Sequence, residues 1–351
     1  MHERPHRPHG IPQETLYLPP TLPADPLGRF TRLYDALNRD RGWWGDASSL
    51  RFAAMAAVTC PGEPSEVANT LRATAEEIKK LSGWFGSLTS SLRFIISALL
   101  VVNGDSAGAF LDEVKRVEGI FRQHGLRRGG IYETMAILVM RQRHDLKPIP
   151  ASSVARFGEL YEEMKRHHWW LTGPDDFPAC AILVGEDGAA GEIGQKVEDI
   201  YQALTDAGFS QGDPLQTAAN LLYLAHVEPS RLADRYRLLA EGFRSQGVSI
   251  WQSDYDELAI LSFLDHPTSR VVERVLEHRR QMEALRPKPD SSLTFNLAAG
   301  IAFMDLVQLD DDLKTITDAK ALLDMQAVIN AQQAASAAAA SSAATASNTS
   351  S

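Results

Sequence analysis

Hydrophobic positions recur along the chain with the spacing of an α-helix, and two kinds of helical segment alternate. One kind keeps its apolar residues on a single face, as Ile193, Val197 and Ile200 do. The other kind is apolar almost all round, as in residues 136–139 and 181–184. An amphipathic helix covers a surface, whereas a helix that is apolar on every side is buried. No stretch shows the sustained alternation of a strand, so the pattern predicts an all-α protein of outer and inner helices.

The more apolar segments recur with a period near 40 residues, which is typical of a two-helix repeat. Seven equivalent anchor positions have spacings of 42, 38, 45, 39, 39 and 41 residues. The first two units are near copies, because residues 48–52 and 90–94 share the string Ser-Ser-Leu-Arg-Phe after a glycine-flanked aromatic pair. The spacing therefore predicts about seven helical hairpins. Their anchors are Ala56, Ala98, Ala136, Ala181, Asn220, Ala259 and Gly300.

Glycine marks the ends of several outer helices, and an apolar residue follows each time. Glycine adopts the left-handed conformation that ends a helix without steric penalty, and the next apolar residue folds back onto the last turn. These glycines are Gly42, Gly83, Gly125, Gly208 and Gly247. A second series, at positions 185, 188, 191 and 194, lacks the Gly-Lys-Ser/Thr ending of a phosphate-binding loop. We interpret that series as a flexible linker between units.

Stacked hairpins predict an α–α solenoid, right-handed and curved far enough to approach a closed α/α toroid. We expect one hairpin domain over residues 27–330, whose last helix, Asp310–Asn330, caps the open end. Residues 1–26 are rich in proline, histidine and arginine, and residues 331–351 are rich in alanine and serine. Such compositions do not build a core, so we expect both ends to be disordered.

Composition narrows the classes of partner. The net charge is -10, from 45 acidic and 35 basic residues, which disfavours nucleic acid and anionic membrane surfaces. Two cysteines, Cys60 and Cys180, cannot form a disulfide framework or a four-cysteine zinc site, and they suit a reducing compartment. Residues 1–26 lack the apolar core of a signal peptide, and no apolar run is long enough to span a bilayer. We therefore expect a cytoplasmic protein without metal or cofactor.

The aromatic-glycine turn before Ser90-Ser91-Leu92-Arg93-Phe94 and the apolar helix ending at Ala98-Leu99-Leu100 resemble a known bacterial family. That family is catalogued only as domain of unknown function 4003, and the resemblance covers roughly residues 27–306. It implies a cytoplasmic bacterial protein with a helical fold. Its motifs are turn and core motifs, so the resemblance supplies no catalytic residues.

The position five residues before each anchor lies near the start of the inner helix. It holds a charged residue in four units: Arg51, Arg93, Asp176 and Asp254. An aspartate there caps exposed N–H groups and suits the positive end of the helix dipole. An arginine is opposed by that dipole, so Arg51 and Arg93 need another explanation. Either they face a groove and bind a carboxylate or phosphate, or each stacks on a tryptophan of the preceding turn and pairs with an acid.

A local basic stretch runs from Lys115 to Lys147, with eight lysines and arginines against three acids. Arg127 and Arg128 lie there in a turn between Gly125 and Gly130. Free backbone amides beside two guanidinium groups would form an anion site. The alternative is a charged outer helix face with no ligand.

Two further motifs do not support a metal site. The run Asp310-Asp311-Asp312 fails the D-D-x-x-D spacing with which all-α prenyl-chain enzymes hold magnesium. His167 and His168 are adjacent on a helix and point about 100° apart, so they cannot readily share a metal ion.

Two functional hypotheses follow. The first is a non-enzymatic binding or scaffold protein that recognises a protein, a peptide or a small acidic ligand on its concave face. The alternative is a hydrolase- or lyase-type enzyme with a carboxylate-lined pocket at the centre of the ring. In that case Asp176 and Asp254 are the candidates for acid–base catalysis.

Limited proteolysis tests the predicted organisation. We expect removal of about 26 residues from the front and about 20 from the back, leaving one resistant core, because disordered ends are cut first. Mass spectrometry of the fragments measures this. Two stable halves separated near residues 185–194 would instead indicate two domains.

Overall fold

The computed structural model describes residues 22–39, 47–81, 90–168, 173–286, 288–289 and 291–307. These ranges contain fourteen α-helices, two short 3-10 helices and no strand, which confirms the all-α prediction. The odd-numbered helices are α1 (Pro26–Arg39), α3 (Pro64–Leu81), α5 (Ala107–Gln123), α7 (Ala151–His168), α9 (Ala190–Asp206), α11 (Pro229–Ser245) and α13 (Thr268–Ala284). The even-numbered helices are α2 (Ala47–Ala56), α4 (Ser90–Asn103), α6 (Ile131–Arg143), α8 (Phe177–Leu183), α10 (Asp213–Tyr223), α12 (Tyr255–Leu261) and α14 (Ser291–Val307). The 3-10 helices η1 (Pro174–Asp176) and η2 (Gln252–Asp254) lead directly into α8 and α12.

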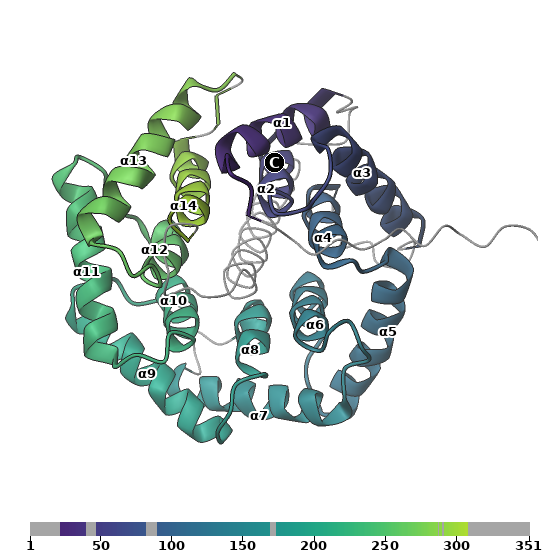
Figure 1. Ribbon diagram of the computed structural model, residues 1–351. Helices are drawn as coiled ribbons and strands as arrows, with labels where there is room; N and C mark the ends of the chain where they lie inside the picture. Colours follow the sequence, from purple (N-terminus) through teal and green to yellow (C-terminus); the bar gives the residue numbers. More distant parts are fainter. Residues whose placement is uncertain are drawn as a thin grey trace, which may run out of the picture.

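The helices form two rows that follow a circle, with the odd-numbered helices outside and the even-numbered helices inside (Figure 1). Each outer helix packs against the inner helix that follows it, and consecutive outer helices pack against each other. Helix α14 contacts both α1 and α2, so the two ends of the array meet. All seven anchor positions lie in the inner helices.

The two rows differ in burial as their hydrophobic patterns predict. All seven residues of α8 and all seven of α12 are buried. By contrast, α9 buries a single stripe, which consists of Ile193, Gly194, Val197, Ile200, Tyr201 and Leu204. The inner helices thus provide one layer of the core, and each outer helix covers it with one face.

The predicted helix ends at three glycines are confirmed. Gly125, Gly208 and Gly247 have φ values of 72°, 94° and 76°. In each case the N–H of the next residue donates to a carbonyl five residues back, which satisfies one of the last carbonyls of the outer helix. These pairs are Leu126–Phe121, Phe209–Leu204 and Val248–Phe243, at 3.0, 3.2 and 3.0 Å. Gly42 and Gly83 lie outside the described residues.

The linker interpretation of the second glycine series is wrong for Gly191 and Gly194. Both lie within α9. A Cβ at Gly194 would lie 3.1 Å from the Cβ of Glu163 on α7. Gly194 therefore allows α7 and α9 to approach each other closely. Such an approach requires a small residue within an ordered helix.

Three arginines on outer helices hold the carboxyl ends of the inner helices in the same way. In each case Nε donates to one carbonyl, and a terminal nitrogen donates to the carbonyls two and four residues later. This geometry satisfies carbonyls that have no partner within the inner helix and places a cation at the negative end of its dipole. The sets are Arg29 with Val58, Cys60 and Gly62; Arg156 with Val184, Glu186 and Gly188; and Arg235 with Ser262, Leu264 and His266.

Some sequence predictions fall on parts that the structure does not describe. These are the capping helix Asp310–Asn330, the head up to residue 21, the tail 331–351, and the tryptophans at 43, 44, 84, 169 and 170. Among the described helices none is long and apolar enough to cross a bilayer alone. Residues 92–103 and 107–123 meet that criterion only as a pair, and the two helices are bent by 107° at the break.

Replacing Arg235 by methionine tests the arginine–carbonyl contacts. The variant keeps the apolar stem but removes the donors to three carbonyls at the end of α12. We expect the free energy of unfolding to fall by about 2 kcal/mol, the range for hydrogen bonds to a charged group. Urea denaturation measures it. The matched control is Arg237→Met on the same helix, which removes only surface ion pairs to Asp234 and Glu241. An equal loss in both variants would contradict a special role for Arg235.

Candidate functional site

Asp176 and Asp254 occupy equivalent positions, one residue before α8 and α12. The Asp176 Oδ2 accepts the backbone N–H of Gly173 at 2.9 Å, and the Asp254 Oδ2 accepts that of Trp251 at 2.8 Å. Each carboxylate thus caps the turn in which it lies. Both side chains are 5% exposed. Each aspartate therefore closes the 3-10 turn before the inner helix, and neither side chain makes the expected cap hydrogen bond to α8 or α12 itself.

The starts of four inner helices lie next to one another. A Cβ added at Gly129, just before α6, would lie 2.9 Å from the ring of Phe177 at the start of α8. Before α10, the N–H of Ser210 donates to the hydroxyl of Tyr255 at the start of α12 at 3.1 Å. The segments between outer and inner helices therefore share one end of the ring.

Acidic residues gather at this end. The pKa of Asp176 is raised to about 7, mainly by burial. The hydrogen bond from the Gly173 N–H lowers this pKa, and the charges of Asp175 and Asp213 contribute to raising it. Burial, followed by the charge of Asp175, also raises the pKa of Asp213. Asp213 begins α10, between α8 and α12. We call Asp175, Asp176, Asp213 and Asp254 the acidic arc.

Two further carboxyls are buried in the first turn of α12. Asp256 is 3% exposed and Glu257 is fully buried. Burial raises the pKa of Asp256 to about 6, whereas a side-chain hydrogen bond with Glu257 lowers it. The Asp256 Oδ2 has no hydrogen-bond partner. Like-charged neighbours in a low-dielectric environment favour one shared proton between them.

Arg51 and Arg93 belong to a different part of the inner row. Arg51 is 3% exposed, and its guanidinium carbon lies 4.8 Å from the centre of the Tyr34 ring on α1. The expected ring was a tryptophan of the preceding turn, and those tryptophans lie outside the described residues. The ring beside Arg51 comes instead from α1. Arg93 is half-buried on α4, which contacts α2. Helices α6 and α14 separate α2 and α4 from the acidic arc (Figure 1).

Trp251 stands out beside the acidic arc because 70% of its surface is exposed. The backbone of this residue is fixed by Asp254, and the neighbouring Gln252 donates to the carbonyl of Gln211 at 3.4 Å. Gln211 lies two residues before Asp213. The exposed Trp251 thus lies at the same end of the ring as the exposed Asp213 and the half-buried Asp175.

The basic stretch is mostly paired within the protein. Arg116, Arg122, Arg141 and Arg143 pair with acidic side chains, and Lys115 and Lys147 each lie near one. In the predicted anion turn the N–H of Gly129 already donates to the buried Glu133 at 3.0 Å. The N–H groups of Gly125 and Leu126 close the end of α5. Part of the backbone expected to bind an external anion is therefore used internally.

Arg127 and Arg128 themselves are exposed. Arg127 lines a hollow of about 480 Å³ between the end of α5 and the outer face of α7. The α7 side of this hollow carries two ion pairs, Lys165–Glu162 at 2.8 Å and Arg166–Glu163 at 2.5 Å. Arg127 thus faces a surface of mixed charge on the outer row.

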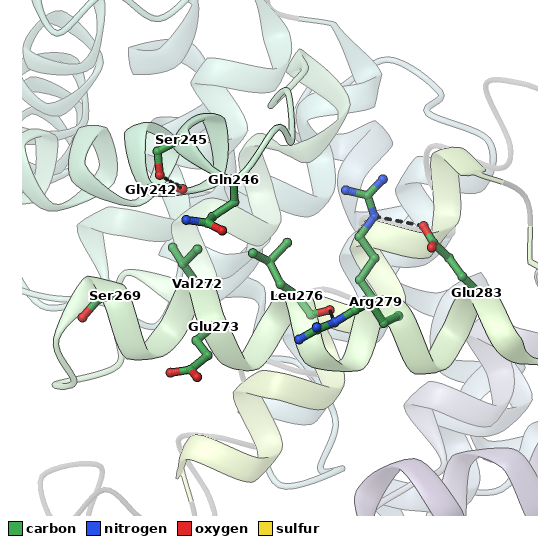
Figure 2. A pocket seen from close by; sticks show the side chains of 10 residues that line it. Gly242, Ser245, Gln246, Ser269, Val272, Glu273, Leu276, Arg279 and Glu283 are labelled. Carbon is green, nitrogen blue, oxygen red and sulfur yellow. Dashed lines mark hydrogen bonds and ion pairs between the residues drawn. The ribbon is translucent and has the colours of Figure 1, made fainter.

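A larger hollow of about 660 Å³ lies between α11 and α13, also on the outer row (Figure 2). Its lining includes Val272 and Leu276 together with the charged Glu273, Arg279 and Arg280. The sequence does not indicate this hollow, because the pattern of α13 is that of an ordinary amphipathic helix. The position five residues before each anchor also excludes four acidic residues at this end of the ring: Asp175, Asp213, Asp256 and Glu257. Of these four, only Asp175, six residues before Ala181, lies next to the position that was compared.

Metal and thiol chemistry gain no support from the described residues. They contain no group of three or more histidine, cysteine, aspartate or glutamate residues that could hold a metal ion. Both cysteines are free and buried. Burial raises the pKa of Cys180 well above its ordinary value, which keeps this thiol protonated.

Substitution of Asp176 by asparagine tests its raised pKa. In the folded protein the Asp176 carboxyl keeps its proton up to about pH 7. In the unfolded chain the same carboxyl releases its proton near the ordinary pKa of 3.8. The protonated Asp176 therefore contributes its full share to the free energy of unfolding below the unfolded pKa of 3.8. This contribution is lost as the pH rises through the folded pKa of about 7. Asparagine cannot ionise but still accepts the Gly173 N–H. We expect Asp176→Asn to become more stable relative to wild type between about pH 5 and about pH 8.

Urea denaturation at the two pH values measures this difference. Asp175→Asn, at the adjacent half-buried position, is the control and should show a smaller change with pH. A difference between wild type and Asp176→Asn that does not depend on pH would contradict the assignment.

Comparisons with known proteins found a partial relative and a family model, and the description of neither names a function. The match to a relative from Bacillus subtilis (strain 168), described as "Uncharacterized protein YeaA", is 28% identical over 143 residues. It covers 40% of this chain and 43% of the relative, so less than half of either protein is compared. No solved structure matches. A family model described as "Protein of unknown function (DUF4003)" matches residues 33–334. This match ends later in the chain than the resemblance expected from the sequence, which covered roughly residues 27–306. The chain therefore belongs to the DUF4003 family.

Proposed function

We propose that the protein is a non-enzymatic binding protein, built as a closed ring of seven helical hairpins. Its recognition surface is the end of the ring where the inner helices begin. The observation that carries this proposal is the exposure of Trp251, 70%, beside the acidic arc. A large aromatic side chain exposed to this extent on an ordered turn is typical of a surface that a partner covers.

The chemistry of this surface favours a basic segment of a peptide or protein partner. Asp213 is exposed and Asp175 is half-buried, so both carboxylates are accessible to a cation. An ammonium or guanidinium group is attracted by a tryptophan face as well as by carboxylates. The net charge of -10 steers a basic partner toward the protein. The acidic ligand expected from Arg51 and Arg93 is less supported, because Arg51 is buried against Tyr34.

A second candidate function is an enzyme that uses buried carboxyls for proton transfer. The observation in its favour is the pKa of about 7 at Asp176, which suits a general acid or base near neutral pH. Against it stands the 5% exposure of this side chain, since a catalytic carboxyl must reach its substrate. We therefore place the binding function first.

Titration with a synthetic lysine octapeptide, followed by calorimetry, tests the binding function. We expect Trp251→Ser to weaken binding about tenfold, because the aromatic face and its desolvated contact are lost. Asp213→Asn should weaken it as well and should reduce its dependence on salt. Leu238→Ser is the matched control, since Leu238 is a 45% exposed apolar residue on the outer row. Equal binding by Trp251→Ser and Leu238→Ser would mean that only general charge attraction holds the peptide.

A further inference from the structure

The hollow between α11 and α13 has the size and construction of a ligand site. Its volume of about 660 Å³ lies within the range of small-molecule pockets. It is formed entirely by described residues of two neighbouring outer helices. Figure 2 shows Val272 and Leu276 in the middle of α13, with Ser269 at one end and Arg279 with Glu283 at the other.

The groove begins where the two helices touch. A Cβ at Gly242 on α11 would lie 2.9 Å from the Cγ2 of Val272, so the helices are in contact at this point. Ser245 and Gln246 continue the α11 side of the groove beyond Gly242. The Ser245 hydroxyl donates to the Gly242 carbonyl within its own helix at 2.7 Å. Gln246 is exposed, and its amide can bond a ligand that enters the groove.

Between these ends the α13 side carries two opposite charges. Glu273 and Arg280 are both exposed and both line the groove. They are seven residues apart, so they lie on the same side of the helix, about 10 Å from each other along its axis. Leu276 lies between them on that side and is partly buried against the core.

Neither charge is neutralised within the described part of the protein. Glu273 forms no ion pair there, and Arg280 only donates its Nε to the Leu276 carbonyl of its own helix at 3.3 Å. The neighbouring arginine differs, because Arg279 Nε lies 3.4 Å from Glu283 Oε1. The groove therefore presents the carboxylate of Glu273, an apolar floor and the guanidinium group of Arg280, in that order, beside the Arg279–Glu283 ion pair.

We propose that this groove binds a short peptide with both termini free, about three residues long. An extended peptide advances about 3.3 Å per residue, so the ammonium and carboxylate of a tripeptide are separated by about 10 Å. The ammonium group then lies at Glu273 and the carboxylate at Arg280. Apolar side chains rest on Val272 and Leu276, and the Gln246 amide bonds the peptide backbone. This site is separate from the surface around Trp251 and does not depend on the function proposed for it.

Calorimetric titration with the tripeptide Leu-Ala-Leu tests the proposal. Acetylation of its amino terminus or amidation of its carboxyl terminus should each weaken binding about tenfold, because each removes one charge-assisted hydrogen bond. Glu273→Gln should abolish the preference for a free amino terminus, and Arg280→Gln the preference for a free carboxyl terminus. Arg237→Gln on α11 is the control and should bind as wild type does.

A charge exchange separates recognition from a structural effect. The double variant Glu273→Arg, Arg280→Glu presents the same two charges in reverse order. A peptide with free termini can turn end for end, so the double variant should bind it within about threefold of wild type. The proposal is overturned if the capped and free peptides bind wild type equally, if no binding occurs at millimolar peptide, or if the double variant binds as weakly as the single variants. Concentration-dependent dimerisation that buries the groove would assign it instead to a second copy of the chain.

Discussion

The structure depends on inner helices that have no polar side. In α8 and α12 every residue is buried, so each of these short helices needs neighbours all around its axis. A flat stack of hairpins leaves the first and last inner helices partly uncovered. In this chain α14 packs against α12 on one side and against α2 on the other. The first and the last described inner helices therefore cover each other. The circular order of the helices thus follows from the hydrophobic pattern of the inner row.

Along their sides the inner helices bury few polar side chains, of which Asn220 in α10 is one. The ends of the inner helices therefore hold most of the buried charge. At the amino ends, Asp176 and Asp254 accept backbone N–H groups. At the carboxyl ends, arginines from the outer helices donate to free carbonyls, as Arg156 does with Val184. The raised pKa of Asp176 is a consequence of this arrangement, because a cap that is enclosed by apolar helices loses its hydration.

The sequence is sufficient to predict the helical class, the two kinds of helix and the left-handed glycines at 125, 208 and 247, because these depend on local spacing. The equivalence of Asp176 and Asp254 could also be predicted, since it rests on register within the repeat. By contrast, the stacking of Arg51 on Tyr34 depends on packing between α1 and α2, which periodicity does not specify. The groove of α11 and α13 was missed for a related reason. Its shape depends on the close contact of Gly242 with Val272, and a single glycine inside a helix does not reveal its partner.

The meeting of α14 with α1 and α2 divides the contacts of the protein into two classes. Within a hairpin, or between consecutive hairpins, the contacting residues are separated by a few tens of positions, so each unit can form on its neighbour with a small loss of loop entropy. The junction between α14 and the first hairpin joins segments from opposite ends of the domain. Its closure therefore costs more loop entropy than a contact between consecutive hairpins. Because of this contact, neither the first nor the last described hairpin is an exposed terminal unit.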